Sequence, residues 1–125
     1  EGVKTVQKIV EASIELKVPI ISFYVFSSEN WKRPKSEINY LFNLIKIYFK
    51  KEIENIFKNK IKINISGRIG KLPLKIRQDL RNATHKTKKN KKLIINLAIN
   101  YGSKNEIVRA VKLIKKKKLK GFLLQ

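Results

Sequence analysis

The chain contains no cysteine. This excludes a disulfide framework and any cysteine-ligated metal site, and it suits a protein of the reducing cytosol. Asp79 is the one aspartate and His85 the one histidine. The sequence therefore carries no aspartate-rich metal motif, and we expect His85 to be an ordinary residue of a surface helix. No apolar run is long enough to span a bilayer and no signal-peptide pattern opens the chain, so we expect a cytoplasmic protein.

Acidic residues are scarce. Nine Asp and Glu oppose 30 Lys and Arg, which gives a formal net charge of +21. Such a charge is typical of nucleic-acid-binding proteins. The basic residues are mostly lysines spread from Lys4 to Lys120, and arginine, the usual residue for recognising phosphates and bases, is scarce. We therefore favour solvated lysine faces and expect no specific nucleic-acid partner, with a basic nucleic-acid-binding domain as an alternative function.

Helical and extended patterns alternate along the chain. At 125 residues, of which 42% are hydrophobic, the chain has the usual size of one domain and enough apolar residues for a core. Apolar residues recur every three or four positions in four segments and run together or alternate in three others. The order is helix, strand, helix, strand, helix, strand, helix. This order predicts an α/β fold, a parallel β-sheet flanked by helices on both faces.

The patterns also predict local features. Ile20–Phe26 is apolar almost throughout, which is typical of a strand buried on both faces. Ser36 and Ser103 are suitable N-caps for the helices that follow them. The last helix should end at Gly121. It should bury its apolar residues Ile107, Ala110, Val111 and Ile114.

The helix expected from Glu37 to Phe57 has two apolar stripes. A surface helix needs only one. The second stripe indicates either a helix enclosed in the core or in a dimer interface, or a helix that lines a channel for an apolar ligand. The first stripe comprises Ile38, Leu41, Phe42, Ile45, Phe49, Ile53 and Ile56, and the second Tyr40, Leu44, Ile47 and Tyr48.

The loop Ser27–Glu37 carries the densest set of polar and aromatic groups, directly after the first expected strand. Open α/β sheets bind ligands at the carboxyl ends of their strands. Trp31 beside Arg33 suits a ligand, because an aromatic face stabilises a cation and a guanidinium binds a diphosphate. The alternative is an ordinary connection. Residues 67–70, Gly-Arg-Ile-Gly, are too short for a phosphate-binding loop, so we expect a turn there.

Two stretches together resemble the cis-prenyltransferases, the family of the undecaprenyl diphosphate synthases. The first is Phe26–Pro34, FSSENWKRP, with Glu37 three positions later. The second is Asn96–Ser103, NLAINYGS, which resembles the strand–turn–helix motif of that family. Glu1-Gly2 is also similar to the end of a further family segment.

The resemblance implies condensation of isopentenyl diphosphate with an allylic diphosphate, such as farnesyl diphosphate, to give a polyprenyl diphosphate carrier lipid. It implies that Asn30 is the catalytic residue and assists proton abstraction. The helix 37–57 would flank the tunnel for the growing chain. The substrate-binding residues would be Ser27, Ser28 and Glu29 against the substrate, Trp31 packed over it, Arg33 on the diphosphate, and Glu37, which orders the loop.

The family's Mg²⁺-binding aspartate segment and its C-terminal arginine-rich segment have no match in this sequence. We therefore expect residues 1–125 to be a single partial domain, with Mg²⁺ ligands outside the chain and no activity when these residues stand alone. The resemblance further implies a homodimer, with peripheral membrane contact as an option. A non-catalytic subunit of the same family is the remaining alternative.

Overall fold

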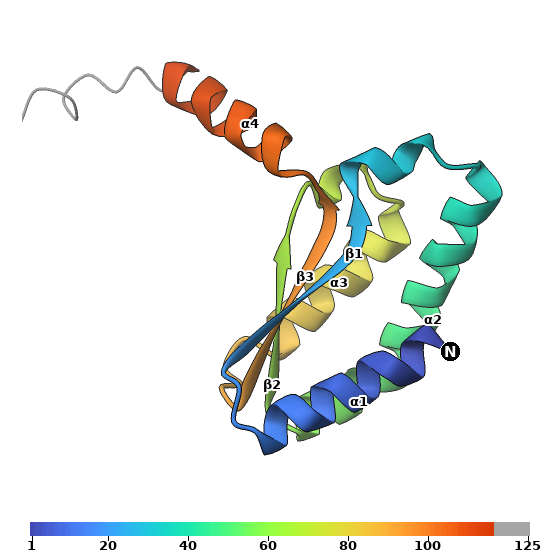
Figure 1. Ribbon diagram of the computed structural model, residues 1–125, viewed down its shortest axis with the longest axis vertical. Coiled ribbons are helices and arrows are strands. Elements are labelled where there is room, and N and C mark those ends of the chain that lie inside the picture. The colour runs from blue at the N-terminus through green and yellow to red at the C-terminus, as the bar shows by residue number, and fades with distance from the viewer. Residues whose placement is uncertain (117–125) are drawn as a thin grey trace, which may run out of the picture.

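The computed structural model describes residues 1–116 and shows helices and strands in alternation (Figure 1). The three strands form one parallel sheet in the order β1-β3-β2. This confirms the α/β class with a parallel sheet flanked by helices. The elements are α1 (Gly2–Glu15), β1 (Ile20–Ser27), the 3₁₀ turn η1 (Ser28–Lys32), α2 (Lys35–Lys58), β2 (Ile61–Ser66), the 3₁₀ turn η2 (Ile69–Lys71), α3 (Leu74–Lys86), β3 (Leu93–Tyr101) and α4 (Ser103–Lys116).

One face of the sheet carries the core. Ile21 of β1 and Ile63 of β2 both lie opposite Ile95 of the central strand β3, and the alternate residues along each strand share this face. Two apolar clusters form on it, one with α1 and the end of α2, the other with the rest of α2 and α3. Leu80 and Leu93 are fully buried. Helices α1, α2 and α3 therefore pack on the same side of the sheet, and within residues 1–116 no helix covers the second face, where the alternation predicts one.

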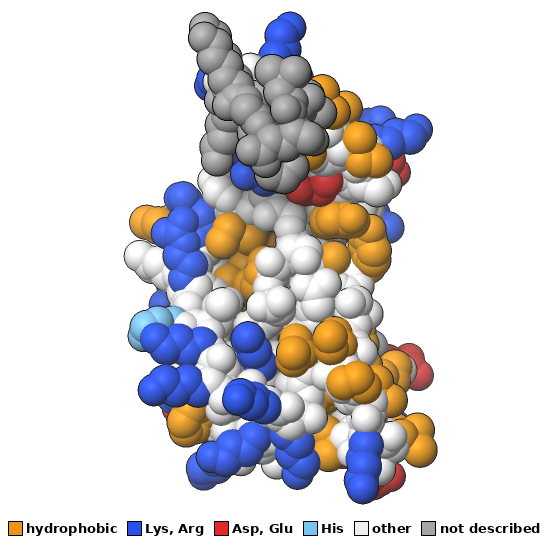
Figure 2. Space-filling model, turned by 90° about the vertical axis from the view of Figure 1, so that its left-hand side faces the viewer, with side chains coloured by type: hydrophobic (Ala, Val, Ile, Leu, Met, Phe, Trp, Pro, Cys, Tyr) orange, Lys and Arg blue, Asp and Glu red, His pale blue; other side chains and the backbone are white. Residues whose placement is uncertain are grey.

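The opposite face of the sheet carries polar side chains. The Ser66 hydroxyl donates to Asn96 Oδ1 at 2.9 Å, and Asn96 Nδ2 donates to Ser22 Oγ at 3.3 Å, so one hydrogen-bonded row crosses all three strands. Figure 2 views the molecule from this side and shows hydrophobic side chains scattered among uncharged ones, with lysines gathered toward the lower end.

The prediction that the first strand is buried on both faces is wrong. Strand β1 lies at the edge of the described sheet, and Ile20 and Tyr24 are 55% and 68% exposed on the polar face. From Ile20 to Val25 exposed and half-buried side chains alternate, and Phe26 is buried after an irregularity in the pairing of β1 with β3. The long apolar run of β1 is therefore not a sign that both faces of this strand are buried.

Two further predictions about helices are wrong. Helix α2 begins at Lys35, and the Pro34 carbonyl accepts from the N–H groups of Glu37 and Ile38, so Ser36 is inside the first turn and is not the N-cap. Helix α4 likewise begins at Ser103, so Ser103 is inside the helix and is not its N-cap.

Within the described chain no helix is long and apolar enough to cross a membrane.

Helix α4 does not bury the apolar residues that its periodicity singles out. It leaves the end of β3 and projects away from the sheet (Figure 1), so nothing in residues 1–116 covers it. The predicted stop at Gly121 lies outside the described residues. The exposed side chains include Ile107 (65%), Val111 (58%) and Ile114 (53%), and Ala110 is exposed as well.

Candidate functional site

A cleft of about 650 Å³ opens between the carboxyl end of β1 and the first half of α2. The structure brings three of the predicted site residues into it: Asn30, Arg33 and Glu37. Ser36, expected to be a helix cap, also lines the cleft. The remaining lining residues are Tyr24, Val25, Phe26, Ile38, Tyr40, Leu41 and Leu44.

Hydrogen bonds within the turn η1 fix the position of Asn30. The Ser27 N–H donates to Asn30 Oδ1 at 2.9 Å, and the Arg33 N–H donates to the Asn30 carbonyl at 3.0 Å. The side-chain oxygen thus closes the turn, and its second lone pair remains available. Asn30 Nδ2 forms no hydrogen bond within residues 1–116. This amide can therefore donate to, and accept from, a group bound in the cleft.

Trp31 is fixed behind the cleft and does not line it. Its ring lies edge-on to Phe26, with centroids 5.0 Å apart, and to Phe42 at 5.8 Å. Its indole N–H donates to Asn100 Oδ1 at 2.8 Å. Trp31 therefore anchors the turn to the core and to β3, and packing of its ring over a substrate stays a prediction.

The three residues before Asn30 also lie outside the cleft. Ser27 ends β1, and Glu29 is exposed on the outer side of the turn. Ser28 Oγ accepts from Asn105 Nδ2 of α4 at 3.0 Å. Gly102 lies so close that a Cβ built on it would be 2.2 Å from Ser28 Oγ, so a side chain at this position would have to displace the Ser28 hydroxyl. Contact of these three residues with a substrate stays a prediction.

The two apolar stripes of α2 have different surroundings. Ile38, Phe42 and Phe49 of the first stripe are buried in the core. From the second stripe, Tyr40 and Leu44 line the cleft together with Leu41. The cleft therefore has polar groups at the η1 end and an apolar wall along α2.

Tyr24 stands at the rim of the cleft, edge-on to Tyr101 with ring centroids 5.5 Å apart. Desolvation, and to a smaller extent the neighbouring Tyr101, raises the pKa of Tyr24 above its ordinary value. The Tyr24 phenol is therefore neutral at physiological pH and can act there only as a hydrogen-bonding group.

The cleft does not form a metal site from the described residues alone. Residues 1–116 contain no group of three or more His, Asp or Glu side chains placed to hold a metal ion. Glu37 is the one carboxylate that lines the cleft. Mg²⁺ is usually held by one or two carboxylates together with substrate phosphates and water, so Glu37 could supply one ligand but does not form a metal site by itself.

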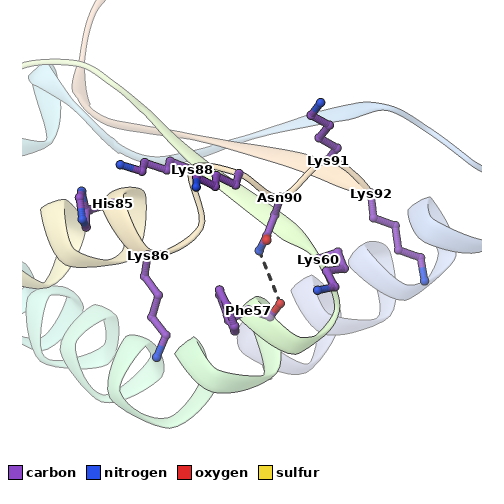
Figure 3. A pocket seen from close by; sticks show the side chains of 9 residues that line it. Phe57, Lys60, His85, Lys86, Lys88, Asn90, Lys91 and Lys92 are labelled. Atoms are coloured by element: carbon purple, nitrogen blue, oxygen red, sulfur yellow. Dashed lines mark hydrogen bonds between the residues drawn. The ribbon is translucent and has the colours of Figure 1, made fainter.

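A second hollow, of about 690 Å³, lies at the amino ends of β2 and β3 (Figure 3). Its lysines point in different directions, and Lys86 is paired with Glu54. Asn90 within it donates to the Ile61 carbonyl at 2.8 Å and so is part of the scaffold. His85 is exposed, as expected. The lining residues are Phe57, Lys60, His85, Lys86, Lys88, Lys89, Asn90, Lys91 and Lys92, and we call this set the basic hollow.

Sequence reasoning missed the role of Asn100. It assigned Asn100 no role beyond its place in the stretch Asn96–Ser103, but Asn100 is 4% exposed and contacts both Trp31 and Arg68 through its side chain. The available signal was an asparagine near the end of a largely apolar strand, because a buried amide needs partners for its polar atoms.

Comparison with known proteins gives consistent matches. Residues 1–123 match the sequence model of the family described as "Putative undecaprenyl diphosphate synthase". The isoprenyl transferase of Clostridium tetani is 44% identical over 92% of this chain and 45% of its own length. That of Halalkalibacterium halodurans is 40% identical over 98% of this chain and 48% of its own.

Solved structures agree with these matches. A probable undecaprenyl diphosphate synthase from Campylobacter jejuni superposes with a TM-score of 0.86 at 39% identity, covering 94% of this chain and 57% of that one. Lavandulyl diphosphate synthase from Lavandula x intermedia, solved with dimethylallyl diphosphate, shares the fold with a TM-score of 0.82 at 22% identity, over 87% of this chain and 47% of that one. The chain spans about half the length of the curated relatives it matches.

Proposed function

The chain belongs to the undecaprenyl diphosphate synthase family, and from this premise we propose that it forms part of a cis-prenyltransferase. The proposed reaction joins isopentenyl diphosphate to an allylic diphosphate such as farnesyl diphosphate. Repetition of this step would build a polyprenyl diphosphate carrier lipid, undecaprenyl diphosphate in this family.

The observation that supports the proposal most is the polarity of the cleft. Arg33 and Asn30 line one end, and Tyr40, Leu41 and Leu44 of α2 line the other. An allylic diphosphate has the same division into an anionic head and a hydrocarbon tail. Arginine suits the head because its guanidinium offers two parallel N–H donors to phosphate oxygens. The apolar wall suits the tail, since apolar contact there removes hydrocarbon from water.

The proposed reaction has three steps, and residues of this chain assist two of them. The C–O bond of the allylic diphosphate breaks, and Arg33 holds the diphosphate that leaves. A C–C bond forms from the double bond of isopentenyl diphosphate to the allylic carbon. The proton that must then leave the new chain is released with the help of Asn30, whose amide orients the acceptor of that proton. An amide is too weakly basic to keep the proton, so its role is orientation.

Further parts of the proposal concern groups that this structure does not contain. Mg²⁺ would neutralise the diphosphate, and its ligands would come from sequence outside this chain. A homodimer is proposed, and the exposed apolar residues of α4 support an interface of some kind. We propose a cytoplasmic enzyme with peripheral membrane contact at the stage of product release.

The test is a prenyl-transfer assay on the polypeptide that carries this chain. Labelled isopentenyl diphosphate, farnesyl diphosphate and Mg²⁺ are supplied, and chain products are separated by length. We expect polyprenyl diphosphates from the longer polypeptide and none from residues 1–125 alone. Absence of products from the longer polypeptide would refute the proposed reaction, and equal rates from both would refute the view that this chain is a partial domain.

A further inference from the structure

Asn100 connects three segments at the carboxyl end of the sheet. It is the next-to-last residue of β3 and is 4% exposed. Its Oδ1 accepts from the indole N–H of Trp31 at 2.8 Å, and its Nδ2 donates to the Arg68 carbonyl at 2.8 Å. Its own carbonyl accepts from the Arg68 N–H at 3.1 Å. One residue thereby holds the turn after β1 and the turn after β2 against the central strand.

The backbone at this junction is adapted to these contacts. Asn100 has a φ of 50°, in the left-handed region, which asparagine tolerates better than most residues. Gly67, before Arg68, has a φ of 116°, and a Cβ on it would be 2.0 Å from the Ile99 carbonyl oxygen. The turn after β2 therefore lies flush against β3, which brings the Arg68 carbonyl within reach of the Asn100 amide.

The contact with Trp31 has consequences for the cleft. Asn30 directly precedes Trp31 and Arg33 follows it by two positions, and both line the cleft while Trp31 does not. The ring contacts of Trp31 with Phe26 and Phe42 do not fix its rotation fully, because edge-to-face pairs tolerate a range of geometries. The hydrogen bond from the indole N–H to the buried Asn100 side chain, which is itself bonded to Arg68, fixes the rotation of the Trp31 ring.

We propose that Asn100 is a positioning residue that sets the orientation of the η1 turn through Trp31 and thereby places Asn30 and Arg33 in the cleft. It touches no substrate. The inference about turnover rests on the proposed function, whereas the inference about the turn rests on the geometry alone.

The experiment compares Asn100→Gly, Asn100→Asp and Trp31→Phe in the polypeptide that carries this chain. Asn100→Gly keeps a backbone that accepts positive φ and removes the side-chain contacts. Asn100→Asp keeps an oxygen acceptor for the indole. Trp31→Phe removes the same hydrogen bond from the other partner and keeps a ring, so the test survives if one variant fails to fold. Asn64→Ala, on the exposed face of β2, is the control.

Two readouts are needed. The first is the ¹⁵N–¹H signal of the Trp31 indole, identified by its loss in Trp31→Phe. We expect Asn100→Gly to move this signal upfield and to speed the exchange of the indole proton with solvent. Asn100→Asp should leave the signal closer to its position in the unaltered protein.

The second readout is kcat for prenyl transfer. We expect Asn100→Gly and Trp31→Phe each to lower kcat by roughly tenfold, as the loss of one well-placed hydrogen bond would, with KM changed less.

Combining the two substitutions distinguishes positioning from a general loss of stability. If both act through the same bond, the double variant should be little worse than either single variant. A double variant whose loss equals the product of the two single losses would overturn the proposal, as would an unchanged kcat in Asn100→Gly. If the unaltered protein transfers no prenyl group, the proposed function fails, and the indole signal and its relaxation alone then decide whether Asn100 orders the turn.

Discussion

The cleft and the basic hollow lie at opposite ends of the parallel sheet and have similar volumes, about 650 and 690 Å³. Their side chains differ in kind. The cleft combines an amide, a guanidinium, a carboxylate and an apolar wall, whereas six of the nine residues of the basic hollow are lysines. Chemical variety in a small volume is what selective recognition of one ligand requires.

The two ends also differ in how their side chains are held. Asn30 takes part in the hydrogen bonds of η1, and Trp31 beside it is anchored on Phe26, Phe42 and Asn100. The lysines of the basic hollow point in different directions on long, flexible stems (Figure 3). The candidate site therefore differs from the basic hollow in the fixed geometry of its side chains and not in its volume, and each of the following variants tests that difference.

The largest effect is expected from Asn30→Ala. If the Asn30 amide orients the proton acceptor, the substitution should lower kcat by about 100-fold or more, within the range for groups that assist proton transfer. The measurement is the prenyl-transfer rate with both substrates saturating.

Asn59→Ala is the matched control for Asn30→Ala, because Asn59 is an exposed asparagine at the other end of the molecule, after α2. It should keep its rate within twofold. Equal losses in the two variants would show that the cleft has no special role and would remove the basis of the comparison.

Arg33→Ala should have the next largest effect. Loss of a charged hydrogen-bonding group to the diphosphate is expected to raise KM for the allylic substrate by roughly 10- to 100-fold. Arg33→Lys should recover only part of this, because an ammonium cannot form the paired contact of a guanidinium. Lys92→Ala in the basic hollow serves as control, and a similar change in KM there would contradict a diphosphate site confined to the cleft.

The position of the site could be predicted from the sequence, and its internal order could not. Strand alternation and the polar loop Ser27–Glu37 sufficed to place Asn30 and Arg33 at the carboxyl end of a parallel sheet, because that edge follows from topology alone. The anchoring of Trp31 by Asn100 joins residues 69 positions apart. A pattern of neighbouring residues in the sequence cannot predict a contact between residues so far apart in the chain.

Two of the failed predictions share a cause. The apolar run of β1 and the apolar stripe of α4 both indicate burial, yet β1 lies at the edge of the described sheet and α4 projects away from it. Hydrophobic periodicity shows which side of an element can be covered. It does not show which segment covers it, and the partner of α4 is not among the described residues. Ser36 failed for a different reason, since the Pro34 carbonyl already accepts from the first turn of α2.

Replacing Lys88, Lys89, Lys91 and Lys92 together by glutamine should change prenyl transfer by less than twofold. It should weaken retention on a polyanion such as heparin, and the slope of affinity against salt should fall by up to about 0.9 per lost phosphate contact. The measurement is a salt titration against duplex DNA of two unrelated sequences. Sequence-selective binding that persists at moderate salt would instead favour the nucleic-acid-binding alternative and would make the basic hollow the functional end.

The smallest effect is expected from Glu54→Gln, which breaks the surface ion pair at the basic hollow. The hydrogen bond and charge of Lys86, with a smaller contribution from Lys58, hold the pKa of Glu54 below its ordinary value. A carboxyl group with a lowered pKa stabilises the fold at pH values above its unfolded pKa, and this contribution disappears as the pH falls through the folded pKa. Urea unfolding should therefore show a small stability difference between the original protein and Glu54→Gln at pH 7, and this difference should shrink as the pH falls through the folded pKa. Because exposed pairs contribute little, and salt screens them, the difference at pH 7 should also shrink in 0.5 M salt. A difference that depends on neither pH nor salt would mean that Glu54 acts through packing, and the basic hollow would then be more ordered than its diverging lysines indicate.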